Sequence, residues 1–166
     1  MNTRDKFLQV IQSNKGIIYK VANAYCHDAE DRKDLVQEII IQLWGTFERY
    51  DDTYKLSTWM YRIALNVAIS FHRKTISRAS INEPLTESMI NIADDNHHGK
   101  LEADITLLQK FINELNELDK ALMLLYLEEN SYREIAEVLG ITETNVASKI
   151  SRIKEKLKQK FKTLNN

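Results

Sequence analysis

The side chains best suited to binding chemistry follow a glycine near the C-terminal end of the sequence. After Gly140, polar and basic residues recur at helical spacing: Thr144, Asn145, Ser148, Lys149, Ser151, Arg152 and Lys156. At this spacing their side chains lie on the outer side of a helix, where amide, hydroxyl and guanidinium groups can reach base edges and phosphates. The pattern predicts a helix that contacts duplex DNA.

The segment 131–153 supplies the elements that would position this helix. Ser131 and Glu134 form a Ser-x-x-Glu capping box at the start of a short helix. Gly140 ends that helix with a positive φ, and Thr142 can cap the next one. The expected buried residues are Ile135, Ala136 and Leu139 on the short helix and Val146, Ile150 and Ile153 on the second. This order favours a DNA-binding helix-turn-helix over an ordinary helical hairpin.

The sequence offers little for catalysis or metal binding. It has no glycine-rich phosphate loop, no His-Glu-x-x-His pattern and no nucleophile-elbow serine. His97 and His98 fall in an expected loop, and Cys26 and His27 are adjacent rather than spaced as ligands. We therefore expect no enzymatic activity, no metal and no cofactor.

Charge changes sign along a chain whose net charge is −1. Every formal charge in segment 61–80 is positive, segment 81–104 is mainly acidic, and segment 148–162 is mainly basic. Two basic blocks around an acidic one suit two phosphate-binding surfaces joined by a segment that avoids DNA. Solvated basic helix faces would give the same pattern, so charge alone leaves both interpretations open.

The composition favours a helical protein of a reducing compartment. Four glycines and one proline leave few turn-forming residues, and leucine, isoleucine, glutamate and lysine are abundant. Cys26 is the only cysteine, so no intrachain disulfide can form. No apolar run reaches the roughly 18–20 residues that a membrane span needs, and the polar start does not resemble a signal peptide. We expect a cytoplasmic protein without membrane insertion.

Hydrophobic periodicity predicts two groups of helices. Ile41 departs from the apolar stripe of the second helix and lies beside polar residues, whereas Trp44 belongs to the stripe. Ser57 is a candidate cap for the third helix. The expected helices cover about 4–26, 29–47, 57–71, 101–118 and 121–127, followed by the helix-turn-helix. The fold class is therefore all-α, with two small helical domains (1–75 and 105–166) joined by an acidic flexible linker (76–104).

Three motifs follow one another along the chain: Asp34-Leu-Val-Gln-Glu38, the stretch from Ser57 to Ala68 and the helix-turn-helix at 131–153. With these motifs the chain resembles bacterial RNA polymerase sigma factors of the extracytoplasmic-function type, in the sigma-70 family. The first half is similar to sigma region two through Asp34-Leu-Val-Gln-Glu38, Leu43-Trp44 and the stretch from Ser57 to Ala68. The second half is similar to region four through Leu115, the stretch 124–129 and the helix-turn-helix. The resemblance covers most of the chain, and it implies a protein that directs the polymerase to promoters of stress- or signal-responsive genes.

The resemblance also implies roles for individual residues. The surface that binds the polymerase clamp helices would comprise Asp34, Gln37, Glu38 and Ile41. The minus-ten element would meet Trp59, Tyr61, Arg62, Asn66, Ser70, Arg73 and Lys74, and segment 47–56 would capture a flipped base. Aromatic side chains suit this task because they stack on unpaired bases. Trp59 fits a core position equally well, and Asn66 fits a solvated position equally well.

The second helix of the helix-turn-helix would read the minus-thirty-five element, although Ala147 replaces a basic residue common in the family. The implied partners are core RNA polymerase, promoter DNA and an anti-sigma factor, with the chain a monomer when free. Two other functions stay open: a free-standing helix-turn-helix regulator that does not bind polymerase, and a helical adaptor that never touches DNA. The similarity of the first half to region two argues against the regulator, and the basic C-terminal run argues against the adaptor.

Overall fold

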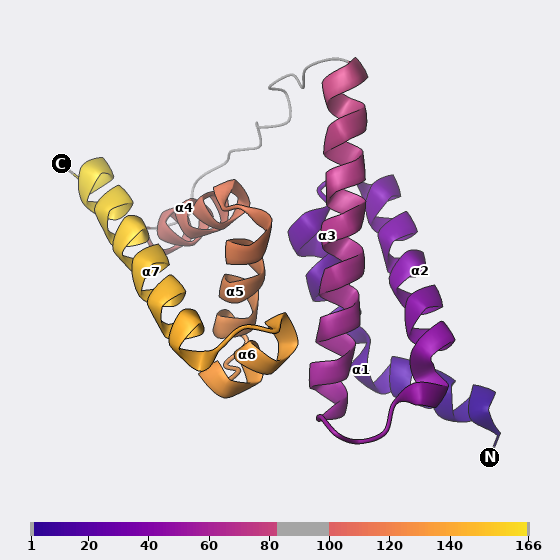
Figure 1. The fold of residues 1–166 in the computed structure, drawn as a ribbon. Helices are drawn as coiled ribbons and strands as arrows, with labels where there is room; N and C mark the ends of the chain where they lie inside the picture. Colours follow the sequence, from indigo (N-terminus) through magenta and orange to yellow (C-terminus); the bar gives the residue numbers. More distant parts are fainter. Residues whose placement is uncertain (1, 83–99, 166) are drawn as a thin grey trace.

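The computed structural model describes residues 2–82 and 100–165, and every regular element in these ranges is helical. The N-terminal unit consists of α1 (Thr3–Tyr25), α2 (Ala29–Thr46), the 3₁₀ turn η1 (Phe47–Arg49) and α3 (Leu56–Asn82). The C-terminal unit consists of α4 (Lys100–Glu114), α5 (Glu117–Leu127), α6 (Tyr132–Leu139) and α7 (Glu143–Asn165). Figure 1 shows the two units side by side, which confirms the predicted all-α fold of two helical domains.

The N-terminal unit is a three-helix bundle around an aliphatic core. Helix α3 packs against both α1 and α2, and its buried face includes the small residues Ala64 and Ala68, which let the neighbouring helices approach closely. Burying one large aliphatic side chain stabilises a fold by about 1.5–3 kcal/mol. The residues with the least exposure in this core are Ile18, Val21, Ala22, Leu35, Ile39, Leu43, Met60, Ala64, Leu65 and Ala68.

Three local predictions in this unit are wrong. Trp44 is 47% exposed, although its ring lies against that of Phe7 at a centroid distance of 5.0 Å. Helix α3 begins at Leu56, and the Lys55 carbonyl accepts the first helical hydrogen bond from the Trp59 amide at 3.1 Å. Ser57 therefore lies inside the helix and does not cap it. Helix α3 also continues to Asn82, beyond the predicted helix end at Phe71.

In the C-terminal unit, buried residues gather between α5, α6 and α7, and they belong to the same hydrophobic cluster as the buried residues of the N-terminal unit. The least exposed residues of the C-terminal unit are Ala121, Leu122, Leu125, Ile135, Val146 and Ile150. On α6 the buried residues are Ile135, Ala136 and Val138, whereas Leu139 is only partly buried, so the expected buried face is shifted by one residue at its end. Each element of the predicted helix-turn-helix is present.

The two units contact each other through the N-terminal unit's α1 and α3 and the C-terminal unit's α5 and α6. The domain limits 1–75, 76–104 and 105–166 stay a prediction, since most of the expected linker, with His97 and His98, lies outside the described residues. No helix in the described ranges is long and apolar enough to cross a membrane.

Candidate nucleic-acid interface

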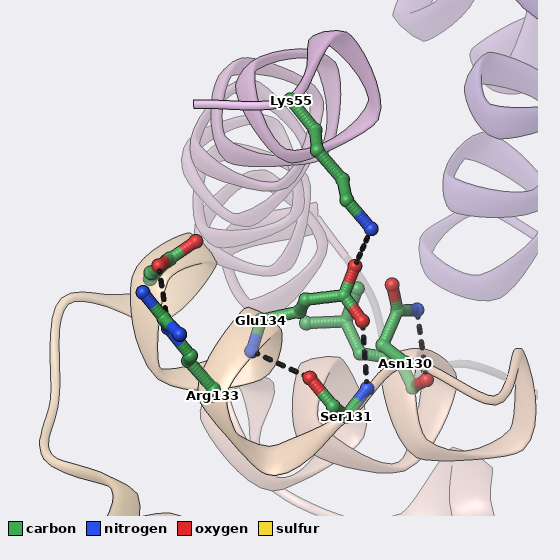
Figure 2. Close-up of polar contacts among 7 residues, drawn as sticks. Lys55, Asn130, Ser131, Arg133 and Glu134 are labelled. Atoms are coloured by element: carbon green, nitrogen blue, oxygen red, sulfur yellow. Dashed lines mark hydrogen bonds and ion pairs between the residues drawn. The ribbon is translucent and has the colours of Figure 1, made fainter. Parts of the chain in front are cut away.

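A complete capping box begins α6. The Ser131 hydroxyl accepts from the Glu134 amide at 3.1 Å, and the Glu134 carboxylate accepts from the Ser131 amide at 3.0 Å (Figure 2). The same carboxylate accepts from the Lys55 ammonium at 2.9 Å. The amide of Ser131, followed by Lys55, lowers the pKa of Glu134 to about 2. The cap that starts the helix-turn-helix is thus also tied to the other helical unit.

The turn between α6 and α7 is fixed by backbone geometry. Gly140 has a φ of 71°, a left-handed conformation that a side chain disfavours. The amides of Gly140 and Ile141 both donate to the Ala136 carbonyl, at 2.8 and 3.2 Å. The Thr142 hydroxyl accepts from the Asn145 amide at 3.0 Å and caps α7. The predicted glycine turn and threonine cap are therefore confirmed, and together they set the angle at which α7 leaves α6.

Helix α7 has one buried face and one basic face. Val146, Ile150 and Ile153 are buried in the C-terminal unit, as predicted. The outer face carries the residues expected to meet the minus-thirty-five element: Thr144, Asn145, Ser148, Ser151, Arg152 and Lys156 are exposed, and Lys149 is half-buried. A helix exposed on one face in this way suits insertion into the major groove.

Along α3, the residues expected to meet the minus-ten element differ in exposure. Asn66, Ser70, Arg73 and Lys74 are exposed, and Arg62 is half-buried with its guanidinium 5.3 Å from the Tyr54 ring centre. Trp59 is half-buried, with its ring centre 5.1 Å from that of Tyr50 and 6.2 Å from that of Phe47. Its side chain is thus packed against the core and partly accessible.

Tyr61 is the buried residue among those expected to meet the minus-ten element. Its side chain is 5% exposed, and burial followed by the Glu128 carboxylate raises its pKa to about 12. Glu128 belongs to the end of α5, in the C-terminal unit. A contact between Tyr61 and DNA therefore requires a rearrangement around this residue.

The segment between η1 and α3 is ordered by its own hydrogen bonds. The Asp51 carboxylate accepts from the amide and hydroxyl of Thr53, at 3.1 and 2.6 Å, and these bonds lower the pKa of Asp51. The Tyr50 hydroxyl donates to the Tyr54 carbonyl at 2.9 Å. Asp52 adopts a φ of 66°. A loop that is held by internal hydrogen bonds and contains Tyr50 and Tyr54 thus lies next to Trp59 at the start of α3.

The residues expected to bind polymerase share one face of α2. Asp34, Gln37 and Glu38 are exposed, and Ile41 is 61% exposed among them, as its departure from the apolar stripe predicts. These four residues line a shallow groove between α2 and α3, together with Asn66, Ser70 and Lys74 of the minus-ten set. The groove therefore contains both the residues predicted to bind polymerase and some of the residues predicted to bind the minus-ten element.

A second hollow joins residues from the two helical units. Arg73 and Ile69 of α3 line it on one side, and Lys149, Arg152 and Lys156 of α7 line it on the other. Residues assigned to the minus-ten and minus-thirty-five elements thus share one hollow.

Sequence reasoning missed the residues that hold the two units together. Lys55, Glu117, Lys120 and Glu128 all make contacts across the boundary. Only Lys120 gives a sequence signal, because a lysine directly before the apolar run 121–127 is placed to be buried. Among the described residues, no group of three or more His, Cys, Asp or Glu side chains could hold a metal ion.

Comparisons with known proteins agree with this geometry. The sigma-70 region 2 model matches residues 10–77, and the sigma-70 region 4 model matches residues 105–157. The ECF RNA polymerase sigma factor SigW of Bacillus subtilis is 28% identical over 97% of this chain and 91% of its own length. The ECF RNA polymerase sigma-E factor of Haemophilus influenzae is 27% identical over 81% of this chain and 76% of its own length.

Two solved structures have a similar fold. CnrH in complex with the cytosolic domain of CnrY matches with a TM-score of 0.69 at 16% identity, covering 98% of this chain and 91% of that one. The sigma factor RpoE of Bartonella quintana, in complex with the anti-sigma factor NepR, matches with a TM-score of 0.66 at 19% identity, covering 96% of each chain. With both sigma regions present in order on two helical units, the chain belongs to the sigma-70 family as a sigma factor of the extracytoplasmic-function type.

Proposed function

We propose that this chain binds core RNA polymerase and directs it to promoters, where the complex opens the DNA and starts transcription. The observation that carries this proposal is the presence of both sigma regions, each with an exposed face of the required chemistry. A free-standing regulator would not require the polar face of α2 around Ile41, and a DNA-independent adaptor would not require the basic outer face of α7. The chain itself catalyses no reaction, because the chemistry of RNA synthesis belongs to the polymerase.

The outer face of α7 reads the minus-thirty-five element. The support is the exposure of Arg152 and Asn145 on a helix whose other face is fixed in the core, so that both side chains can reach base edges in the major groove. Thr144, Ser148, Lys149, Ser151 and Lys156 contact phosphates or bases beside them. The missing lysine at Ala147 removes one phosphate contact.

The N-terminal unit binds the minus-ten element and the polymerase. Arg62, Asn66, Ser70, Arg73 and Lys74 face the DNA, and the loop at 47–56 receives an unpaired base beside Trp59. The hydrogen bonds within that loop support this role, because an ordered loop loses little conformational entropy when a base enters it. The clamp helices of the polymerase dock on Asp34, Gln37, Glu38 and Ile41, where the apolar Ile41 side chain supplies the centre of a polar patch.

The remaining features follow from this function. The chain acts in the cytoplasm, with the polymerase, as a monomer until it joins the complex, and its target genes respond to stress or an external signal. An anti-sigma factor restrains it, a partner supported by the similar fold of the sigma factor RpoE, which was solved in complex with the anti-sigma factor NepR.

Paired substitutions test the assignment of α7. Arg152→Ala should weaken recognition at one base position by about 1–3 kcal/mol, or roughly 5- to 150-fold. Lys158→Ala, at an exposed position on the same helix, should weaken binding evenly on all sequences and reduce its salt dependence. Binding of the reconstituted polymerase complex to a library of minus-thirty-five variants would measure both effects. Equal losses for the two variants on every sequence would show that Arg152 does not read bases.

A further inference from the structure

A buried lysine lies at the contact between the two helical units. Lys120 of α5 is 3% exposed, and its ammonium donates to the Ala24 carbonyl of α1 at 3.3 Å. The same ammonium lies 5.1 Å from the ring centre of Tyr25. Both of these partners are uncharged and belong to the N-terminal unit. A full positive charge is therefore held between the units by a carbonyl dipole and an aromatic face.

Two histidines lie at the same contact. His72 of α3 is half-buried, and its ring centre is 6.0 Å from that of Tyr25 in an edge-on arrangement. His27 directly follows Cys26, between α1 and α2. Partial burial, followed by the charge of Lys120, lowers the pKa of both imidazoles. Both rings are therefore mostly neutral at neutral pH.

Around His72, the negative charge that could offset an added proton is already engaged. Glu117 of α5 faces the imidazole, but its carboxylate accepts from the Arg73 guanidinium at 2.8 Å. A hydrogen bond with the Tyr25 backbone and the charge of Glu117 favour the protonated ring, and burial and Lys120 together outweigh them. A proton on His72 would thus place a second cation beside the buried ammonium.

Around His27, the start of α2 supplies charges of both signs. Asp28 and Asp31 contribute negative charge at this turn, and Asp28 already accepts from the Asp31 amide at 3.0 Å as the cap of α2. Arg32 faces the imidazole and donates to the His27 carbonyl at 3.1 Å. The Arg32 Nε atom is buried and forms no hydrogen bond with the described residues. The charges that lower the pKa of the His27 imidazole are those of positive groups.

Protonation of the imidazoles therefore opposes the contact. Like charges repel more strongly where water is excluded, and Lys120 moves away from both rings when the units separate. The pKa of each imidazole then rises toward its ordinary value of about 6.5. A histidine whose pKa is lower in the closed form stabilises that form fully above pH ~6.5, and this stability is lost as the pH falls through the lowered pKa.

We propose that the contact between the two helical units is an acid-sensitive switch, closed at neutral pH and opened when His72 and His27 bind protons beside Lys120. Imidazole suits this role because it is the side chain that ordinarily titrates between about pH 5 and pH 8. The switch is a property of the contact alone, so it does not require the chain to bind polymerase or DNA.

Cys26 can report the opening of the contact in the full-length, unsubstituted chain. It is the only cysteine, it is 6% exposed, and it lies close enough to Lys120 for the ammonium to act on its thiol. The rate at which a pyridyl disulfide modifies the thiol is divided by the rate in denaturant at the same pH. This ratio measures the fraction of chains in which the thiol is accessible, and it removes the effect of pH on the thiol itself.

Replacing the histidines in pairs separates the switch from other effects of acid. In the wild type, the accessible fraction should rise by roughly 3- to 100-fold between pH 7.5 and pH 5.5, since each proton bound on opening contributes at most about tenfold per pH unit. The sensor variant, His27→Gln with His72→Gln, should change by less than about twofold. It keeps the bond from Arg32, which uses the backbone carbonyl. The matched control, His97→Gln with His98→Gln, removes two histidines outside the described residues and should behave as the wild type.

A second measurement leaves both histidines in place. Lys120→Met removes the ammonium and keeps an apolar stem of similar length. The pKa of His72, followed by NMR in the full-length chain, should therefore rise above its wild-type value, because the neighbouring positive charge is gone. An unchanged pKa would show that the ammonium does not act on this imidazole.

Three outcomes of the thiol assay would overturn the switch. The first is a wild-type accessible fraction that stays constant between pH 7.5 and pH 5.5. The second is an equal rise in the sensor variant and the control, which would assign the effect to other groups. The third is a loss of helix by circular dichroism in parallel with the exposure of Cys26, which would show that acid unfolds the chain instead of separating its units.

Discussion

Gly140 provides the sharpest test of how the sequence builds the helix-turn-helix. Its φ of 71° lies in the left-handed region, and a Cβ added there would meet no atom within 4 Å. Gly140→Ala therefore introduces backbone strain without a steric clash. An L-residue in this conformation costs about 1–2 kcal/mol, part of which is offset because alanine also restricts the unfolded chain. We expect a net destabilisation of about 1 kcal/mol, confined to α6 and α7.

Gly45→Ala is the matched control. Gly45 lies within α2, and a Cβ added there would also meet no atom within 4 Å. Alanine is favoured over glycine inside a helix by about 0.5–1 kcal/mol, so this variant should be more stable than the wild type. The two substitutions add the same methyl group, one at a left-handed position after a helix and one at a helical position.

Amide hydrogen exchange measures both effects locally. A loss of about 1 kcal/mol corresponds to a roughly fivefold loss of protection, which should appear in α6 and α7 for Gly140→Ala and be absent from α2. Gly45→Ala should increase protection in α2. If Gly140→Ala leaves exchange in α6 and α7 unchanged or slower, the left-handed turn does not limit the stability of this motif and the reasoning is refuted.

Three further predictions concern the core, the cap and the cysteine. Ile150→Ala should destabilise the C-terminal unit by about 2–5 kcal/mol because Ile150 is fully buried, and a loss below about 1 kcal/mol in chemical denaturation would contradict this packing. The pKa of Glu134 is lowered from 4.5 to about 2, so its ionised form contributes stability above pH 4.5 that is lost as the pH falls toward 2. The stability difference between wild type and Glu134→Gln should therefore shrink between pH 6 and pH 3, and a constant difference would contradict the assigned contacts. Burial raises the pKa of Cys26 to about 11, so a thiol reagent at pH 8 should modify it far more slowly in the folded chain than in denaturant, and equal rates would show that it is accessible.

The local elements were largely predictable because each has a short-range cause. The Ser131–Glu134 capping box, the Gly140 turn and the Thr142 cap depend on residues within a few positions of one another, so sequence spacing defines them. The exposure of Ile41 followed from helical periodicity for the same reason.

The errors arose where tertiary contacts decide the outcome. Trp44 has core-like spacing on α2, but it remains 47% exposed even with its ring against that of Phe7. Helix α3 begins one residue before the predicted cap Ser57, and the Trp59 amide donates to the Lys55 carbonyl at this end.

The contact between the units was not predictable from local pattern. Lys20 and Glu128 are more than a hundred positions apart in the sequence, and each is an ordinary surface residue in its own helix. A single sequence does not reveal which distant charges pair, so Tyr61 and Arg73 could be assigned to the minus-ten element without any sign that Tyr61 is buried or that Arg73 pairs with Glu117.

The most direct test of the account is transcription by core RNA polymerase supplemented with the purified chain. A pool of genomic fragments from the same source as the chain would serve as template, with polymerase binding measured by co-purification. We predict that the chain co-purifies with core polymerase and that new transcripts start at a common pair of upstream sequence elements. A chain that binds duplex DNA but neither joins core polymerase nor yields new transcripts would contradict its action as a sigma factor.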